Sequence, residues 1–149
     1  MNASHPTAPT PSVEFAAATV GTQLPPLELS FTRADLVRYA GASGDFNPIH
    51  WSDRKAADLG LSSVIAHGLL TMGRALKIVT DWAGDPGRVR SYGVRFTKPV
   101  EVPDTDEGVV VRVTATVTAV TDGVATVAID ALCGETKVLG AARAEVSLA

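Results

Sequence analysis

Residues 68–83 read GLLTMGRALKIVTDWA, and this stretch decides the fold class. Apolar side chains recur in it at the three- and four-residue spacing of an α-helix, and the charged side chains lie largely on the opposite side. The predicted apolar stripe consists of Leu69, Met72, Gly73, Leu76, Val79 and Ala83. The GDPG segment at 84–87 then stops the helix. We therefore expect one long amphipathic helix with a buried face.

Gly73 stands in the middle of this predicted helix. A glycine there costs about 1 kcal/mol relative to alanine, because it adds no side chain and leaves the backbone more freedom when unfolded. Its presence predicts that another backbone passes close to the helix at this point.

Downstream of the helix the hydrophobic period changes from helical to two. Valine and alanine alternate with arginine and threonine over residues 109–119, as is typical of a strand with one buried face. Three more strands are expected, over residues 88–96, 124–132 and 136–148. Turns at 121–123 and 134–135 join the last three strands into an antiparallel meander. A helix that precedes such a sheet buries its stripe on the apolar face of the sheet, so the fold class is α+β.

Upstream of the helix, residues 27–31 alternate between apolar and polar and predict a half-buried strand. Thr32 with Asp35 three positions later resembles a capping box, so a helix should begin here and end at Gly41 and Gly44. A second short helix is expected to open at Ser52 and Asp53, with Gly60 as its left-handed terminator.

The composition fits one globular domain, since 46% of the 149 residues are hydrophobic and 19% are charged. We expect a flexible tail at 1–12, where almost no large apolar side chain occurs, and a single domain at 13–149. The net charge of −3 is interspersed, which disfavours nucleic acid and anionic membranes as partners. The single cysteine, Cys133, the absence of a signal-like start and the charges that interrupt every long apolar stretch predict a cytoplasmic protein.

The segment SGDFNPIH at 43–50 carries the most chemical information. On a straight helix Asp45 and His50 would point about 140° apart. Pro48 disfavours the helical conformation at Asn47, so the chain must turn, and a turn can bring the carboxylate and the imidazole to one cavity. Spacing alone leaves a second reading open, in which Asp45 bonds nearby backbone NH groups and His50 is a satisfied buried side chain.

This segment, followed by IAHGLL at 65–70 and YGVRFTKPV at 92–100, resembles the MaoC-like (R)-specific enoyl hydratases and dehydratases. The resemblance covers most of the chain after Val13. More narrowly, the chain is similar to the catalytic subunits of the actinobacterial dehydratases of long-chain fatty acid elongation. The resemblance implies a hot dog fold, in which a curved antiparallel sheet wraps one long helix, and a dimer with the active site near the subunit interface.

The resemblance also implies the roles of single residues. Asp45 and His50 are expected to be the acid–base pair, and the backbone NH of Gly68 the oxyanion donor. Asn47 is expected to orient the loop or a bound water, with a purely structural turn role equally open. His67 is expected to be structural. Some relatives carry a serine eight residues after the oxyanion glycine, where this chain has Leu76, which puts in doubt any inference about rate or substrate preference.

The implied activity is that of a hydro-lyase that interconverts a (3R)-hydroxyacyl thioester with a trans-2-enoyl thioester and water. The acyl group would be carried on acyl carrier protein or coenzyme A, with no cofactor and no metal, in a homodimer or a heterodimer with a second hot dog subunit. Two alternatives are a non-catalytic acyl-binding or assembly subunit and a hot dog protein of polyketide synthesis. An iron site at Asp45, His50 and His67 is disfavoured because the short spacing between first histidine and carboxylate is missing.

Overall fold

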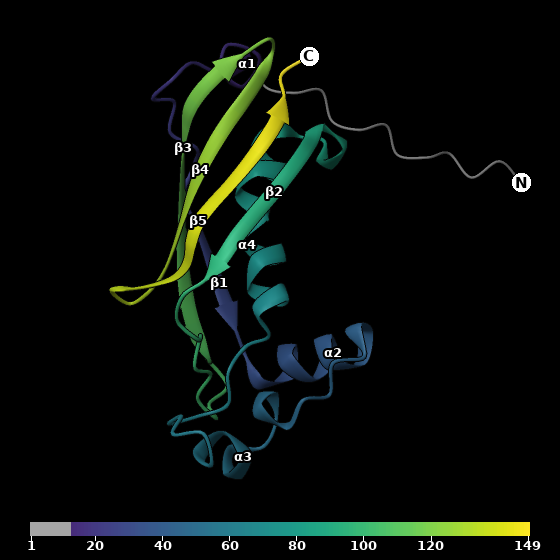
Figure 1. The fold of residues 1–149 in the computed structure, drawn as a ribbon, viewed down its shortest axis with the longest axis vertical. Helices are drawn as coiled ribbons and strands as arrows, with labels where there is room; N and C mark the ends of the chain where they lie inside the picture. The colour runs from purple at the N-terminus through teal and green to yellow at the C-terminus, as the bar shows by residue number, and fades with distance from the viewer. Residues whose placement is uncertain (1–12) are drawn as a thin grey trace, which may run out of the picture.

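A computed structural model describes residues 13–149 of the chain (Figure 1). The predicted tail at 1–12 lies outside the described residues. Within residues 13–149, no helix is long and apolar enough to cross a membrane. The elements in chain order are α1 (Val13–Ala16), β1 (Leu27–Phe31), α2 (Arg33–Ser43), η1 (Pro48–His50), α3 (Asp53–Ala57), α4 (Gly68–Ala83), η2 (Pro86–Arg88), β2 (Val89–Phe96), β3 (Val109–Thr121), β4 (Val124–Cys133) and β5 (Thr136–Ser147).

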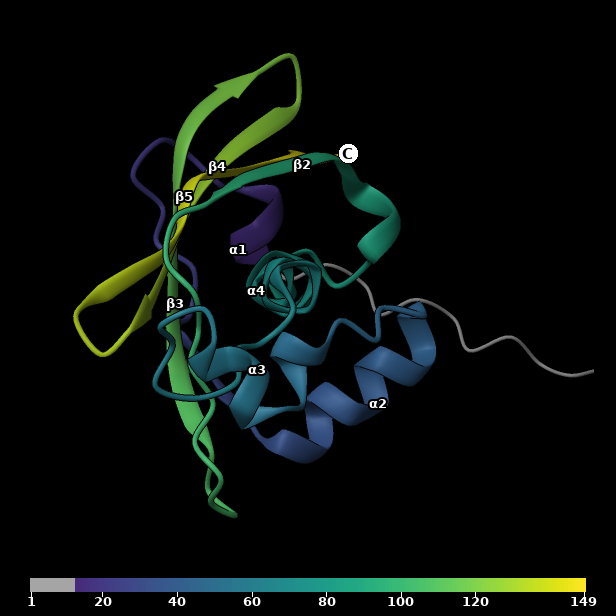
Figure 2. The ribbon, with the colours of Figure 1, turned by 60° about the horizontal axis from the view of Figure 1, so that its bottom comes forward.

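The five strands form one antiparallel sheet in the order β1-β3-β4-β5-β2. The last three strands are the predicted meander, and Asp122 and Gly123, with φ of 51° and 72°, make the two-residue turn between β3 and β4. Seen along α4, the sheet curls around the helix (Figure 2). This confirms the predicted α+β class and the predicted arrangement of a curved sheet around one long helix.

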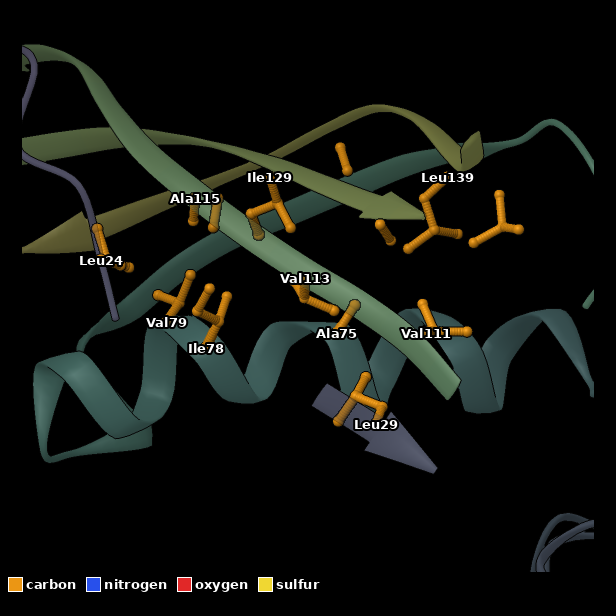
Figure 3. Packing of buried hydrophobic residues seen from close by; sticks show 14 of the residues in the cluster. Leu24, Leu29, Ala75, Ile78, Val79, Val111, Val113, Ala115, Ile129 and Leu139 are labelled. Carbon is orange, nitrogen blue, oxygen red and sulfur yellow. The ribbon is translucent and has the colours of Figure 1, made fainter. Parts of the chain in front are cut away.

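The face of α4 that packs on the sheet differs from the predicted stripe. Its buried residues are Thr71, Ala75, Ile78, Val79, Trp82 and Ala83. Leu69, by contrast, is 63% exposed, and Met72 and Leu76 are only half-buried. Of the predicted stripe, Val79 and Ala83 are confirmed as buried, but the prediction left out Ala75, Ile78 and Trp82. The short side chain of Ala75 instead lets the helix lie close to the concave sheet, against Val111 and Val113 (Figure 3).

The predicted close approach of a backbone to Gly73 is wrong within the described part of the chain. A Cβ built on this residue meets no atom of residues 13–149 within 4 Å. The reason is that α4 packs on the sheet with a different face from the predicted one, which leaves Gly73 on the exposed side of the helix. Next to it, the hydroxyl of Tyr92 on β2 donates a hydrogen bond of 3.1 Å to the carbonyl of Met72.

The helices α2 and α3 lie at the end of α4 where that helix begins (Figures 1 and 2). The predicted cap of α2 is confirmed, since Thr32 and Asp35 form a full capping box. The helix ends at Gly44, which adopts the left-handed conformation with φ of 75°, whereas Gly41 lies inside the helix. Gly60 has the expected positive φ of 77°, but α3 ends earlier, at Ala57.

The two tryptophans of the chain have different surroundings. The indole of Trp82 is buried, and the ring of Phe15 meets it edge-on with centroids 4.6 Å apart. Trp51 is 54% exposed, and its Nε1–H donates to the carbonyl of Phe46. Trp82 therefore belongs to the core, whereas Trp51 lies at the surface. Cys133 ends β4 half-buried, and its partial burial raises the pKa of the thiol.

Candidate active site

The loop that follows α2 is built from two successive side-chain turns. The Asp45 carboxylate accepts a hydrogen bond of 3.2 Å from the backbone NH of Asn47. The Asn47 amide oxygen then accepts 3.3 Å from the NH of Ile49 and caps η1, with Pro48 at its first position. These bonds are the reason a Gly-Asp-Phe-Asn-Pro sequence folds locally in this way. They aim the second carboxylate oxygen of Asp45 toward His50.

The imidazole of His50 is buried and its tautomer follows from its contacts. Its Nδ1 lies 2.7 Å from the carbonyl oxygen of Ile65. A carbonyl only accepts, so Nδ1 carries a proton, and in the neutral ring Nε2 holds the lone pair. Nε2 lies 3.8 Å from Asp45 Oδ2. The structure thus brings the two predicted side chains together, with a basic nitrogen turned toward a carboxylate.

A cavity of about 300 Å³ opens beside this pair. It is lined by His50, Ile65, Ala66, Gly68, Thr71, Phe96, Thr97, Lys98, Pro99, Val100, Val138 and Leu139. Asp45 and Asn47 are not part of the lining. The side chain of Asp45 is 52% exposed and lies beside the cavity-lining His50. The lining is mostly apolar with a few polar side chains, which is typical of a small-molecule binding site.

Gly68 is the first residue of α4 and lines the cavity. A first-turn NH has no acceptor within its helix, and the positive end of the helix dipole lies here. A Cβ on Gly68 would come within 3.1 Å of the Phe96 ring, so a larger residue would crowd the cavity. Gly68 therefore combines a helix-start amide with a place in the cavity wall, and its role as an oxyanion donor stays a prediction.

His67 immediately precedes this amide and is 1% exposed. It occupies the cap position of α4, as expected for a helix-start residue, but its side chain makes no cap hydrogen bond. Its Nε2 instead lies 3.1 Å from the backbone carbonyl of Asp45, and its ring stacks on His50 with centroids 3.7 Å apart and planes 22° from parallel. Burial lowers the pKa of His67 more than its hydrogen bond to the Asp45 carbonyl raises it, and the neighbouring His50 lowers it further.

Ligand atoms of Asp45, His50 and His67 lie within 4.8 Å of one another. A metal ion binds an imidazole nitrogen along its lone pair, in the plane of the ring. The two rings are nearly parallel and stacked, so their lone pairs run along separate lines and do not meet at one point. The Nε2 of His67 is also occupied by the Asp45 carbonyl. This geometry suits proton transfer rather than a shared ion.

Two further cavity residues were not predicted from the sequence. Thr71 lies one helical turn after Gly68, is 3% exposed and donates through Oγ1 to the carbonyl of His67. Its polar side chain on the buried side of α4 was the available signal. Phe96, 53% exposed, contacts the Gly68 position from the end of β2. Leu76, the position of the serine in some relatives, is not part of the lining.

Comparison with known proteins places this geometry in a family. A model of the MaoC-like domain matches residues 14–132. The chain is 44% identical over 85 residues to the 3-hydroxyacyl-thioester dehydratase X of Mycobacterium tuberculosis, which covers 56% of the chain but only 29% of that relative. It is 35% identical over 108 residues to the 3-oxo-4,17-pregnadiene-20-carboxyl-CoA hydratase beta subunit of the same organism, covering 72% of the chain and 80% of the subunit.

Solved structures agree. A MaoC-like dehydratase superposes with a TM-score of 0.87 at 37% identity, over 94% of this chain and 43% of that one. The ChsH1–ChsH2 complex from Mycobacterium tuberculosis gives 0.75 at 30% identity over 87% and 97% of the two chains. The (R)-hydratase from A. caviae involved in PHA biosynthesis gives 0.77 at 25% identity, over 89% and 98%. With a family model matching over residues 14–132 and a hot dog fold throughout, the chain belongs to the MaoC-like dehydratase domain family.

Proposed function

We propose that the chain is a hydro-lyase that interconverts a (3R)-hydroxyacyl thioester with the corresponding trans-2-enoyl thioester and water. The observation that carries the proposal is the 3.8 Å approach of His50 Nε2 to the Asp45 carboxylate, with His50 and the Gly68 amide lining one cavity. The activities named for relatives of the chain support the same chemistry. The chain matches only 29% of the length of the dehydratase X relative, so the activity of that whole protein is not transferred to this chain. The proposal rests on the geometry of the site.

The reaction needs three things, and the site offers each. The thioester oxygen gains negative charge when the proton beside the carbonyl is lost, and the Gly68 NH at the start of α4 donates to it. The neutral His50 ring has a free lone pair at Nε2. The Asp45 carboxylate holds the 3-hydroxyl or the water. In dehydration the pair takes one proton from carbon 2 and delivers one to the departing hydroxyl, so the site returns to its starting protonation.

Substrate class and cofactor requirement follow from the cavity and the reaction. The apolar lining by Val100, Val138 and Leu139 suits the first carbons of an acyl chain. Elimination of water changes no net oxidation state, so the reaction needs no redox cofactor, and we propose that none takes part. The stacked rings of His50 and His67 support a site without a metal. The thioester carrier is acyl carrier protein or coenzyme A. The cytoplasmic location stays a prediction that rests on the single cysteine rather than on the substrate.

We further propose that the chain acts as a dimer with a second hot dog subunit, either its own copy or a different chain. Two relatives are named as a hydratase beta subunit and as part of a two-component complex. In this chain β2 is an edge strand, and Leu69 and Phe96 near the site are 63% and 53% exposed. A partner that covers these apolar side chains would also close the site from water.

A spectrophotometric hydration assay tests the function, with crotonyl-CoA and longer trans-2-enoyl-CoA substrates, on the chain alone and with a candidate partner. Asp45→Asn and His50→Ala should each lower kcat by about 10²–10⁴-fold, the usual contribution of an acid–base group. Asp81→Asn is the matched control, because it makes the same chemical change in an exposed carboxylate that pairs with Lys77 on α4.

The outcomes separate the proposed enzyme from the alternatives. An active complex whose turnover is unaffected by both site variants would identify the chain as a non-catalytic acyl-binding or assembly subunit. Activity on polyketide intermediates but not on simple enoyl thioesters would move it to a polyketide pathway. Silence of the wild-type chain in every combination would remove the enzyme proposal altogether.

A further inference from the structure

His67 is a buried histidine with contacts to both members of the proposed acid–base pair. Its Nε2–H donates 3.1 Å to the backbone carbonyl of Asp45, since a carbonyl can only accept. The face of its ring lies against the face of His50, 3.7 Å between centroids. Its own backbone is the residue before the Gly68 amide. One side chain therefore touches the carboxylate loop and the imidazole and is joined to the oxyanion donor.

The contacts also fix the protonation state of the ring. With the proton on Nε2, the lone pair is on Nδ1, which is buried and has no hydrogen-bond partner among the described residues. A second proton on Nδ1 would be a buried charge without an acceptor, which folding strongly disfavours. The groups that face His67 are the edge of the Tyr39 ring from α2, Asp45 and His50. Burial, the largest influence, lowers the pKa of His67 accordingly.

A purely structural role explains this arrangement poorly. A leucine or phenylalanine would fill the same space without leaving a buried nitrogen unpaired. The polar ring gains only one hydrogen bond, and that bond goes to the loop that carries the Asp45 carboxylate rather than to the helix that His67 begins. The unpaired nitrogen destabilises the fold, and the one hydrogen bond that the ring gains in return orders the Asp45 loop.

We propose that His67 is a positioning residue of this site, which holds the Asp45 loop through its donated hydrogen bond and supports the His50 ring by stacking as a neutral partner. A neutral neighbour leaves His50 free to carry the proton during turnover, whereas two stacked imidazolium rings would repel each other. The inference rests on the proposed function.

Two substitutions separate the two contacts. His67→Gln places an amide NH near the position of Nε2 and keeps the donor, whereas His67→Phe keeps a stacking ring and removes the donor. We expect His67→Phe to lower kcat per folded enzyme about tenfold or more, with KM changed less than about twofold. His67→Gln should recover a large part of that loss. Tyr39→Phe is the control, because it preserves the ring that meets His67 and should leave kcat unchanged.

Either of two results would overturn the proposal. One is full kcat per folded molecule in His67→Phe, with only less protein folded, which is what a structural role predicts. The other is an equal loss in His67→Gln and His67→Phe, which would show that the hydrogen bond to Asp45 has no part in turnover.

A spectroscopic measurement on the wild-type chain keeps the inference testable even if the variants fold poorly or the hydratase assay is silent. Nitrogen-15 correlation spectra of the histidine rings report tautomer and charge directly. We expect His67 to be neutral with its proton on Nε2 at pH 7. A ring protonated on Nδ1, or a cation at that pH, contradicts the positioning role, whereas a silent assay with the expected tautomer contradicts only the proposed reaction.

Discussion

The two ends of α4 are built in opposite ways. At its C-terminal end Trp82 and Ala83 are buried, Phe15 packs edge-on against the indole, and Gly84 closes the helix with an NH that donates to the Thr80 carbonyl. At its N-terminal end the side chain of His67, the cap residue, makes no cap hydrogen bond, and Gly68 lines a cavity. Apolar side chains cover the first end, which we call the packed end, whereas the second end lies beside a cavity, and we call it the open end.

The difference shows how one helix serves both stability and chemistry. Helix ends normally satisfy their free backbone groups by capping, so an uncapped first turn beside a cavity leaves donors for a ligand. Stability lost there is offset by apolar burial at the far end, about 24 Å away along 16 residues at 1.5 Å each. Substitutions at the two ends should therefore affect different measurements, stability at one and turnover at the other.

The largest expected effect is at the packed end of α4, where Trp82 is buried. Trp82→Ala should lower the free energy of unfolding by about 3–5 kcal/mol, since it removes a buried aromatic side chain and leaves a cavity next to Phe15. Urea unfolding followed by circular dichroism measures this change. Trp51→Ala, at a position 54% exposed, is the control and should cost no more than about 1 kcal/mol. Equal losses in the two variants would mean that the far end does not provide the stability assigned to it.

The next effect is at the open end and concerns activity. Gly68→Ala adds a methyl group that meets the Phe96 ring at 3.1 Å beside the proposed oxyanion donor, and it should lower kcat/KM about tenfold. Stability should change by less than about 1 kcal/mol, because Phe96 is half-exposed and can yield. The measurements are the enoyl thioester assay and urea unfolding.

Gly73→Ala is the matched control on the same helix. A Cβ there meets nothing within 4 Å in residues 13–149, so the chain should gain up to about 1 kcal/mol from helix propensity and keep its activity. If Gly73→Ala lowered activity as much as Gly68→Ala, the effect would belong to the helix as a whole rather than to its first amide.

The contrast between the ends also marks what sequence could predict of the fold. The strands and the bounds of α4 could be predicted from local signals. These are the hydrophobic period of two that starts at Val109 and the GDPG segment that stops the helix after Ala83. The buried face of α4 could not be predicted in this way. Leu69 looked like core, yet the sheet contacts Ala75, and which side a curved sheet touches is set by long-range packing rather than by the helix itself.

For the site, the motif placed Asp45, His50 and Gly68, and the structure brings them to one end of α4. The turn at Pro48 supplied the physical reason for the first two. The contacts of His67 were not foreseen, because a residue 17 positions after His50 stacks on it only through the packing of separate elements. Sequence spacing carries no information about such a contact.

A smaller effect tests the Gly84 cap at the packed end of α4. Gly84 ends α4 with φ of 72°, a left-handed conformation that a residue with a Cβ adopts at a cost of about 1–2 kcal/mol. Gly84→Ala should therefore lower the free energy of unfolding by about 1 kcal/mol with no change in kcat. Thermal unfolding and the enoyl thioester assay together check both parts. A loss of activity without loss of stability would contradict the division between the two ends.

The smallest expected effect is the pH dependence of stability from His67 at the open end. Burial lowers its pKa in the folded chain, whereas an unfolded histidine titrates near 6.5. The unfolded state therefore binds the proton more readily, and stability rises with pH in this window. Its contribution should be complete above pH 6.5 and should be lost as the pH falls below that value toward the depressed pKa of the folded state.

Thermal unfolding between pH 8 and pH 5 measures this slope, and His67→Gln, which removes the titrating ring but keeps a donor toward Asp45, should flatten it. Asp35 and Asp53 do not interfere, because the pKa of each carboxyl is lowered from an ordinary value that is already acidic. For Asp35 the hydrogen bonds to Thr32 and the nearby arginines outweigh the effect of burial, and for Asp53 the cause is Arg33. If the wild-type chain and His67→Gln lost stability in parallel below pH 6.5, the buried neutral ring would not be the cause. If stability is independent of pH in His67→Gln but not in the wild-type chain, the acid sensitivity of the fold belongs to the His67 ring, which also holds the Asp45 loop. The reason is that a histidine kept neutral in the folded state releases a proton on folding.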